Sequence, residues 1–206
     1  MSTSFDVYPG KHYIPSFAEL LDISNQRINN FLINLGILRS IMVDVEVHNN
    51  KDYPLIKFNM NDKLIWNEDS YAWFFIPGVA GGTDCYYYKI TDLDREIWKE
   101  EIETNIKAQQ LHDIINRSID IGYRWSFRRS VGQPGIINLA YGLIAASLAE
   151  ITDGFVYSDD GAWDYNCFPS LAEDFFEWYL KPDSATKNSD KIWAQQCIKS
   201  IYGELK

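Results

Sequence analysis

The chain has 206 residues, of which 46% are hydrophobic and 15% aromatic, enough apolar surface for a sizeable core and too much for a disordered chain. Its 29 acidic and 19 basic residues give a formal net charge of −10. Because a phosphate backbone is bound by a basic face, this balance argues against a nucleic-acid partner. The length fits one domain, and we expect a single α+β domain over residues 1–206.

The cysteines and the hydropathy pattern indicate the compartment. Cys85, Cys167 and Cys197 are too few and too scattered for a disulfide framework or a zinc site, and their odd number fits a reducing compartment. The N-terminal residues lack the apolar run of a signal peptide, and no stretch reaches the length of a membrane span. We therefore expect a cytoplasmic protein with no membrane contact.

In the first half of the chain, a helix is followed by a meander of short strands. Ser16 and Glu19 form a capping box, and an apolar stripe then continues to Leu35, before the natural stop at Gly36. Residues 41–48 alternate with period two, which predicts a half-exposed strand. A turn at residues 49–52 comes next. Further short strands are expected at residues 55–60, 64–66, 71–76 and 85–90.

In the second half, helices predominate. Residues 91–118 have helical texture with a break near Asn105 and an end at Gly122. Residues 123–128 predict a strand with aromatic side chains facing the core and arginines facing out. Pro134 opens a nearly uncharged helix that reaches Thr152, and we expect it to be the central buried helix.

The remaining elements complete an α+β fold. A hairpin is expected at residues 154–164 around an Asp-Gly turn, then a second capping box from Ser170 to Glu173 opening a helix, and a last helix over residues 189–202. The predicted fold is an antiparallel sheet, made of the meander and the later strands, packed against several helices.

Charge is segregated along the chain. Residues 130–180 contain no lysine, arginine or histidine but eight acids, so this quarter of the chain carries −8 and the remainder −2. All eight acids lie from Glu150 onward. Charge gathered in this way is typical of a surface that attracts a basic partner.

Five of these acids are the candidate partner-binding residues, since they are close in sequence and fall in turns and a first helical turn. They are Asp159, Asp160, Asp164, Glu173 and Asp174. Two other interpretations remain open. The acids are equally explained as a solvated face paired with Arg124, Arg128 and Arg129, or, for the three aspartates, as ligands of a hard cation, although the EF-hand pattern is missing.

No motif specifies a reaction. The histidines, His12, His48 and His112, lack metal-ligand spacing, and the glycines at 78–82 form neither a dinucleotide-binding nor a phosphate-binding loop. Cys85 follows that loop but opens an aromatic run, which favours a packed thiol over a nucleophile. We therefore expect no enzyme activity and no cofactor.

Residues 139–164 resemble a pattern in which an alanine-rich helix ends in a Thr-x-Gly step, followed by a short strand, an aspartate turn and an aromatic residue. The residues that match are Ala145, Ala146, Leu148, Ala149, Thr152, Gly154, Asp159, Asp160, Gly161 and Trp163. The pattern is similar to that of immunity proteins of bacterial polymorphic-toxin and contact-dependent-inhibition systems. The resemblance implies a non-enzymatic cytoplasmic protein that binds and neutralises a cognate toxin, often a basic nuclease, and an acidic surface suits that partner.

Two alternatives remain open. One is a metal-dependent or small-molecule enzyme whose type the sequence does not reveal. The other is a structural or assembly subunit of a phage or secretion apparatus, with aromatic side chains at an interface. The candidate aromatics are Tyr86, Tyr87, Tyr88 and Trp98.

Overall fold

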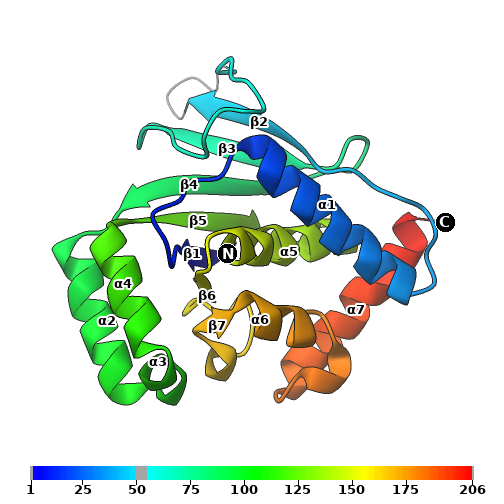
Figure 1. The fold of residues 1–206 in the computed structure, drawn as a ribbon. Coiled ribbons are helices and arrows are strands. Elements are labelled where there is room, and N and C mark those ends of the chain that lie inside the picture. The colour runs from blue at the N-terminus through cyan, green and yellow to red at the C-terminus, as the bar shows by residue number, and fades with distance from the viewer. Residues whose placement is uncertain (1, 50–54, 206) are drawn as a thin grey trace.

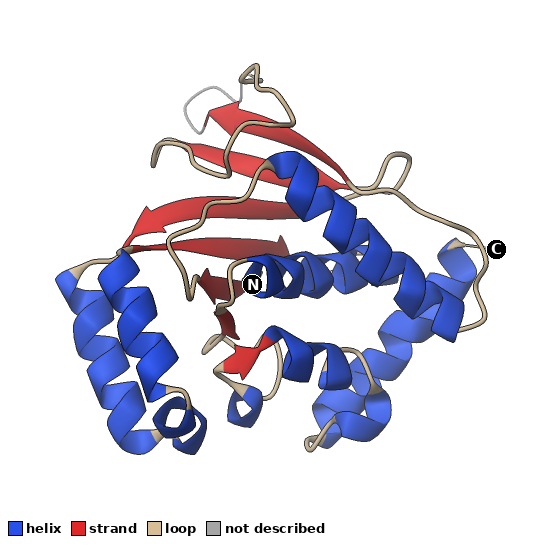
Figure 2. Cartoon of the chain, viewed as in Figure 1, coloured by secondary structure: helices blue, strands red, loops and turns tan. Residues whose placement is uncertain are grey.

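The computed structural model describes residues 2–49 and 55–205, which form one antiparallel sheet with helices packed on it (Figures 1 and 2). The strands are β1 (Ser2–Tyr8), β2 (Asp44–Asn49), β3 (Ser70–Phe75), β4 (Thr83–Lys89), β5 (Tyr123–Ser130), β6 (Phe155–Tyr157) and β7 (Ser170–Leu171). The α-helices are α1 (Phe17–Asn34), α2 (Asp92–Thr104), α3 (Ile106–Gln110), α4 (His112–Ile121), α5 (Gly135–Ile151), α6 (Ala172–Trp178) and α7 (Asn188–Glu204). Two 3-10 helices are η1 (Tyr165–Cys167) and η2 (Pro182–Ser184). The α+β class expected from the sequence is confirmed.

The strands of the sheet follow the order β2-β3-β4-β5-β1-β6-β7, and every neighbouring pair is antiparallel. β1 therefore lies inside the sheet, between β5 and β6, although it comes first in the chain. Phe5 pairs with Phe127 of β5, and Val7 pairs with both Trp125 and Val156. The sequence did not predict this strand, because its seven residues alternate apolar with polar only briefly and no turn signal precedes them.

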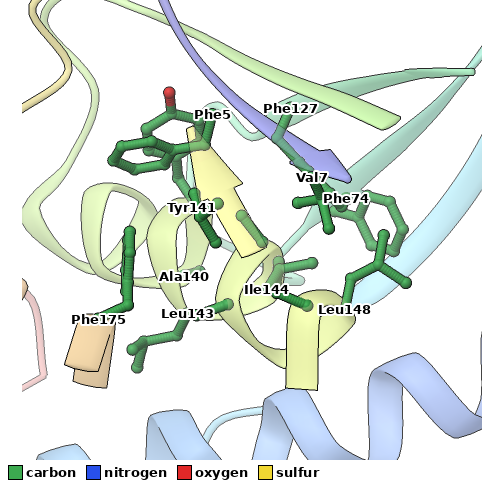
Figure 3. Packing of buried hydrophobic residues seen from close by; sticks show 14 of the residues in the cluster. Phe5, Val7, Phe74, Phe127, Ala140, Tyr141, Leu143, Ile144, Leu148 and Phe175 are labelled. Atoms are coloured by element: carbon green, nitrogen blue, oxygen red, sulfur yellow. The ribbon is translucent and has the colours of Figure 1, made fainter. Parts of the chain in front are cut away.

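Helix α5 is the centre of the core, as expected. Every residue from Gly135 to Ala149 is buried, and α1, α6 and α7 pack around the helix (Figure 1). Figure 3 shows its apolar side chains meeting those of the sheet, and the rings of Tyr141 and Phe5 stack with their centroids 4.5 Å apart. Gly142 is required by this packing, since an added Cβ would lie 2.2 Å from the ring of Tyr179.

Helix α1 forms as its sequence predicts. Glu19 accepts from the backbone N–H of Ser16, whose hydroxyl in turn accepts from the backbone N–H of Glu19, which is the expected capping box. Gly36 follows the helix with a φ of +76°, a conformation that favours glycine. On the helix itself, Asn25 accepts from the N–H of Val43, which holds the start of β2 against α1.

The meander is shorter than predicted. Residues 55–60 and 64–66 are not strands; they contribute only isolated bridges, from Leu55 to His48 and from Lys63 to Ser16. This segment instead supplies core contacts, because the carbonyl of Leu64 accepts from the indole N–H of Trp125 at 2.7 Å. Most of the turn expected at residues 49–52 lies outside the described residues.

Two further predictions in the second half are wrong. No hairpin forms at residues 154–164, because β6 pairs with β1 and β7 and residues 162–164 belong to no strand. No second capping box forms either, since Ser170 lies in β7 and its hydroxyl donates to the carbonyl of Leu171. In both places a strand pairing that is remote in sequence displaces a local turn or cap.

Residues 92–121 form the three short helices α2, α3 and α4, which lie together at one end of the sheet (Figure 1). Asn105 separates α2 from α3, at the break that the sequence predicts, and Gly122 ends α4 with a φ of +89°. On α2, Trp98 packs its ring on Tyr8 and Phe155. Among the described residues no helix is both long and apolar enough to cross a membrane.

Candidate functional site

The sheet has two faces with different coverings. Alternate residues of each strand, such as Phe5, Phe127 and Cys85, point toward α5 and are fully buried. The remaining residues point away from α5. At the β1–β6 end, Trp98 of α2 covers Tyr8, Phe155 and Tyr157, and the uncovered residues form what we call the open face. Its side chains on β2, β3, β4, β5 and β1 are Asp44, Glu46, His48, Tyr71, Trp73, Phe75, Asp84, Tyr86, Tyr88, Arg124, Ser126, Arg128, Ser4 and Asp6.

These side chains of the open face are covered mainly by one another. All but Tyr71, which is 8% exposed, are half-buried or exposed. A row of rings crosses the face from His48 on β2 through Tyr71 and Tyr86 to Tyr88, with neighbouring centroids 5.3 to 5.9 Å apart. Aromatic rings in such a row present a broad, ordered surface of the kind found in protein interfaces.

One interpretation of the sequence paired the five predicted acids with Arg124, Arg128 and Arg129, and it is wrong, because the two arginines of the open face pair with other acids. Arg128 lies 2.8 Å from Asp84 and over the ring of Tyr86. Arg124 lies 2.9 Å from Asp6, and its Nε lies 3.6 Å from Asp94. Arg129 departs from the expectation: it points to the α5 face, is buried, and has no acidic partner within ion-pair distance among the described residues.

Carboxylates from separate parts of the chain meet at the β1–β6 end of the open face. We call this group the acidic corner. Its members are Asp6 on β1, Asp94 and Glu101 on α2, and Asp159 and Asp160 after β6. The spacing of Asp94, Trp98 and Glu101 puts all three on one side of α2, the side that Trp98 packs against the sheet.

Arg124 joins two members of the acidic corner, since its guanidinium contacts both Asp6 and Asp94. Burial raises the pKa of Asp6, the ion pair with Arg124 lowers it, and the negative charges of Asp159 and Asp160 raise it further. Burial likewise raises the pKa of the neighbouring Tyr157, with further contributions from Glu101 and Asp159. Among the described residues, Arg124 is the cation in contact with the corner.

Each predicted aspartate of the 159–164 segment has its own environment. Asp160 is exposed but anchored, since its carboxylate accepts from both the backbone N–H and the hydroxyl of Ser4, at 2.6 and 2.7 Å. Asp159 is exposed beside it. Asp164 is enclosed, with its side chain 0% accessible, 3.0 Å from Lys187 Nζ and hydrogen-bonded to Thr186. The carboxylate of Asp164 is therefore not on the surface that the sequence assigned to it.

Glu173 and Asp174 are exposed in the first turn of α6, where they also complement the helix dipole. They do not join Asp159 and Asp160. In the antiparallel pairing of β6 with β7, Leu171 lies opposite Phe155, so α6 begins beyond the start of β6. Asp159 follows the end of the same strand. The five predicted acids thus form two exposed pairs, at opposite ends of β6, and one buried carboxylate.

Two of the three aspartates proposed as cation ligands, Asp160 and Asp164, accept hydrogen bonds from protein donors. Asp164 accepts from Thr186 and Asn166 and pairs with Lys187, while Asp160 accepts from Ser4 and Ser158. Within residues 2–49 and 55–205, no group of three or more histidine, cysteine or acidic side chains has metal-binding geometry. Cys85 is buried, and burial raises the pKa of its thiol well above the usual value, which suits a packed thiol.

The aromatic side chains that looked exposed in the sequence fall into three environments. Trp98 is only 2% exposed and belongs to the core. Tyr87 points to the α5 face, where its ring meets Trp125. Tyr86 and Tyr88 lie on the open face, so two of the four aromatic residues predicted for an interface are found there.

Three members of the acidic corner were missed in the sequence. Asp6 lies in an unpredicted strand, and Asp94 and Glu101 lie outside the segment that is free of basic residues. The signal that identifies the last two is their spacing around Trp98, which marks one side of a helix.

Comparison with known proteins adds no relative. No family model matches the chain, and searches of curated proteins and of solved structures found no similar protein.

Proposed function

We propose that this protein is a non-enzymatic inhibitor that binds a basic protein through the acidic corner. From the resemblance of residues 139–164 to immunity proteins, we further propose that the partner is a bacterial toxin, with a nuclease as the expected type. The observation that carries the proposal is the meeting of five carboxylates from three separate segments, with Arg124 as the cation in contact with them.

The arrangement costs native stability, which is why it points to function. Burial, and after it the negative charges of Asp159 and Asp160, raise the pKa of Asp6, so its ionised form is disfavoured in the folded protein. Carboxylates that served solubility alone would be spread over the surface, where they repel one another less. Charges gathered against their own repulsion are typical of sites that recognise an opposite charge.

The acidic corner and the open face would favour binding of a basic partner in two ways, through the association rate and through the contact area. Lysine and arginine side chains that bind nucleic acid would meet the corner during diffusion and associate faster. The neighbouring tyrosines Tyr86 and Tyr88 would then supply contact area on the same face, since tyrosine is enriched in protein interfaces. The corner and the open face together would cover the surface that a nuclease uses for its substrate.

The test first looks for a toxin-domain reading frame directly upstream of this gene and then produces that toxin domain in cells with or without this protein. We expect co-expression to restore growth and the purified pair to form a complex. The double variant Asp159→Asn/Glu101→Gln should bind at least about tenfold more weakly, because each charge-assisted contact contributes on the order of 1.5–3 kcal/mol.

The matched control is Glu173→Gln/Asp174→Asn, which removes the same charge from the other end of β6. We expect this variant to bind within about twofold of the parent protein, since rim charges contribute little to affinity. If instead the control loses affinity and the corner variant does not, the partner binds at α6 and the acidic corner is not its site. Failure of this protein to bind or protect against the toxin would contradict the inhibitor proposal.

A further inference from the structure

Arg129 is a charged side chain in an unusual place. Strand alternation puts it on the α5 face of β5, in line with Trp125 and Phe127, and it is 7% exposed. The other ionic side chain in the buried class, Asp164, has Lys187 as its counter-ion. Arg129 has no carboxylate within ion-pair distance among the described residues. Buried charges are normally paired, so this guanidinium lacks an anion.

The contacts of Arg129 leave much of its hydrogen-bonding capacity unused. Its Nη1 donates to Asn138 Oδ1 at 2.9 Å, its Nε is enclosed without a partner, and Nη2 has no hydrogen bond to any described residue. The guanidinium lies between two rings, 5.2 Å from the centroid of Tyr141 and 4.9 Å from that of Trp193. These rings hold its position and orientation, but they accept no conventional hydrogen bond from it.

A cavity of about 500 Å³ adjoins Arg129 between β1, β5, the start of α5 and α7. Its polar lining consists mostly of neutral side chains: Thr3, Gln133, Asn138, Gln196 and Ser200. Neither an acid nor a second base lines it. The acid that lies nearby, Glu204, accepts from the N–H groups of Gly135 and Ile136 and is thus committed to the start of α5.

We infer that this cavity binds a small organic carboxylate, with Arg129 as the group that recognises its negative charge. A guanidinium presents parallel N–H groups that match a carboxylate, and the neutral amides and hydroxyls around it can complete the hydrogen bonds. One cation in the lining balances one negative charge, which favours a monocarboxylate over a phosphate dianion. Trp193, Val131 and Ala162 supply apolar surface for the remainder of the ligand.

This site is independent of the proposed toxin contact. Arg129 and the neighbouring Arg128 point to opposite faces of the sheet, so a ligand beside Arg129 does not lie on the open face. Arg128 is therefore a matched control: it is an arginine one residue away, paired with Asp84 and outside the cavity. Loss of toxin binding would leave this inference intact, and the reverse also holds.

The experiment titrates the whole protein with benzoate at constant ionic strength, with benzamide, chloride and inorganic phosphate as comparison solutes. The readouts are two NMR signals, the Nε–Hε signal of Arg129 and the indole N–H signal of Trp193. We expect a saturable response to benzoate and none to benzamide or chloride. A response to phosphate should need at least about tenfold more solute, since the second charge of a phosphate dianion has no cation in the lining.

Variants assign the response to the arginine. Arg129→Gln should lower the affinity for benzoate by at least about tenfold, and Arg128→Gln should change it by less than about twofold. If Arg129→Gln does not fold, Arg129→Lys takes its place, since it keeps the positive charge. Arg129→Lys should still lower the affinity for benzoate by about fivefold, because lysine lacks the planar guanidinium group. A response that does not saturate, that survives Arg129→Gln, or that is stronger for phosphate overturns the inference.

Discussion

The carboxylate of Asp164 lies 3.0 Å from Lys187 Nζ and is completely enclosed by protein. The same carboxylate accepts from Thr186 and from the backbone N–H of Asn166, so it ties the start of η1 to the segment before α7. Of the five acids that the sequence nominates for partner binding, Asp164 is the one that lies in the buried class. The Asp164 carboxylate therefore contributes to the stability of the fold and is not available to a partner.

Replacing Asp164 should therefore affect stability and not recognition. We expect Asp164→Asn to lower the free energy of unfolding by about 1–3 kcal/mol, the usual cost of leaving buried hydrogen-bonding groups unsatisfied. Burial raises the pKa of Asp164, but hydrogen bonds from Thr186, Lys187 and Asn166 lower it more, so the net pKa lies below 3.8. The stabilisation is thus present above about pH 4 and is lost as the pH falls further. Urea unfolding at pH 7 and pH 3 measures both effects; equal stability of variant and parent at pH 7 would show that the ion pair contributes nothing.

The pKa of Asp6 reports on the acidic corner directly. Because Asp159 and Asp160 raise it, the double variant Asp159→Asn/Asp160→Asn should lower the pKa of Asp6 toward its ordinary value. The raised pKa means that the folded protein holds this proton more tightly than the unfolded chain. Native stability therefore falls as the pH rises from about 3.8 through the raised value, and it falls less in the variant.

Carboxyl carbon NMR over pH 2–8 measures the pKa of Asp6 in both proteins. Glu173→Gln/Asp174→Asn is the control, since these residues lie at the other end of β6. If the pKa of Asp6 changes in the control and not in Asp159→Asn/Asp160→Asn, the carboxylates of the acidic corner do not lie together as described.

Glu19 should give the opposite pH dependence. Hydrogen bonds from the hydroxyl of Tyr13 and from the backbone and hydroxyl of Ser16 lower the pKa of Glu19 to about 2. The unfolded chain has the ordinary value of 4.5, so the stabilisation is complete above that pH and is lost as the pH falls toward about 2. Thermal unfolding from pH 2 to pH 7 should show this dependence in the parent and a weaker one in Glu19→Gln. Asp22→Asn, on the exposed side of the same helix, should keep the parental profile.

Gly142 tests the packing of the core. We expect Gly142→Ala to destabilise the protein by about 1–3 kcal/mol, the typical cost of overpacking, because the new methyl group would overlap the ring of Tyr179. Gly203→Ala is the matched control on α7, where an added Cβ meets nothing within 4 Å. It should stabilise by about 0.5–1 kcal/mol through helix propensity. Chemical denaturation of both variants measures the difference, and a neutral Gly142→Ala would contradict the packing described.

Local sequence patterns predict the helices well and the sheet only in part. Helices α1 and α5 carry their own signals, a capping box in the first and an uninterrupted apolar run in the second. β1 carries no such signal, because its place between β5 and β6 depends on partners more than a hundred residues away. Pairing with β1 and β7 likewise displaced the local hairpin expected at residues 154–164, since non-local contacts override turn preference.

The acidic corner likewise contains some residues that the sequence identified and others that only the tertiary structure brings in. Asp159 and Asp160 were identified from charge segregation, which is visible in one dimension. Asp6, Asp94 and Glu101 join them only through tertiary packing, in particular the seating of Trp98 on Tyr8. Arg129 was grouped with Arg124 and Arg128 as an arginine that pairs with acids, whereas the strand register places it on the α5 face.

The most direct test of the acidic corner is the rate at which this protein associates with the basic toxin domain that we propose as its partner, measured by stopped-flow fluorescence at several salt concentrations. We expect Asp159→Asn/Glu101→Gln to slow association and flatten its salt dependence, and Glu173→Gln/Asp174→Asn to leave both near the parental values. Equal association rates and equal salt dependence for the parent and the corner variant would contradict this expectation.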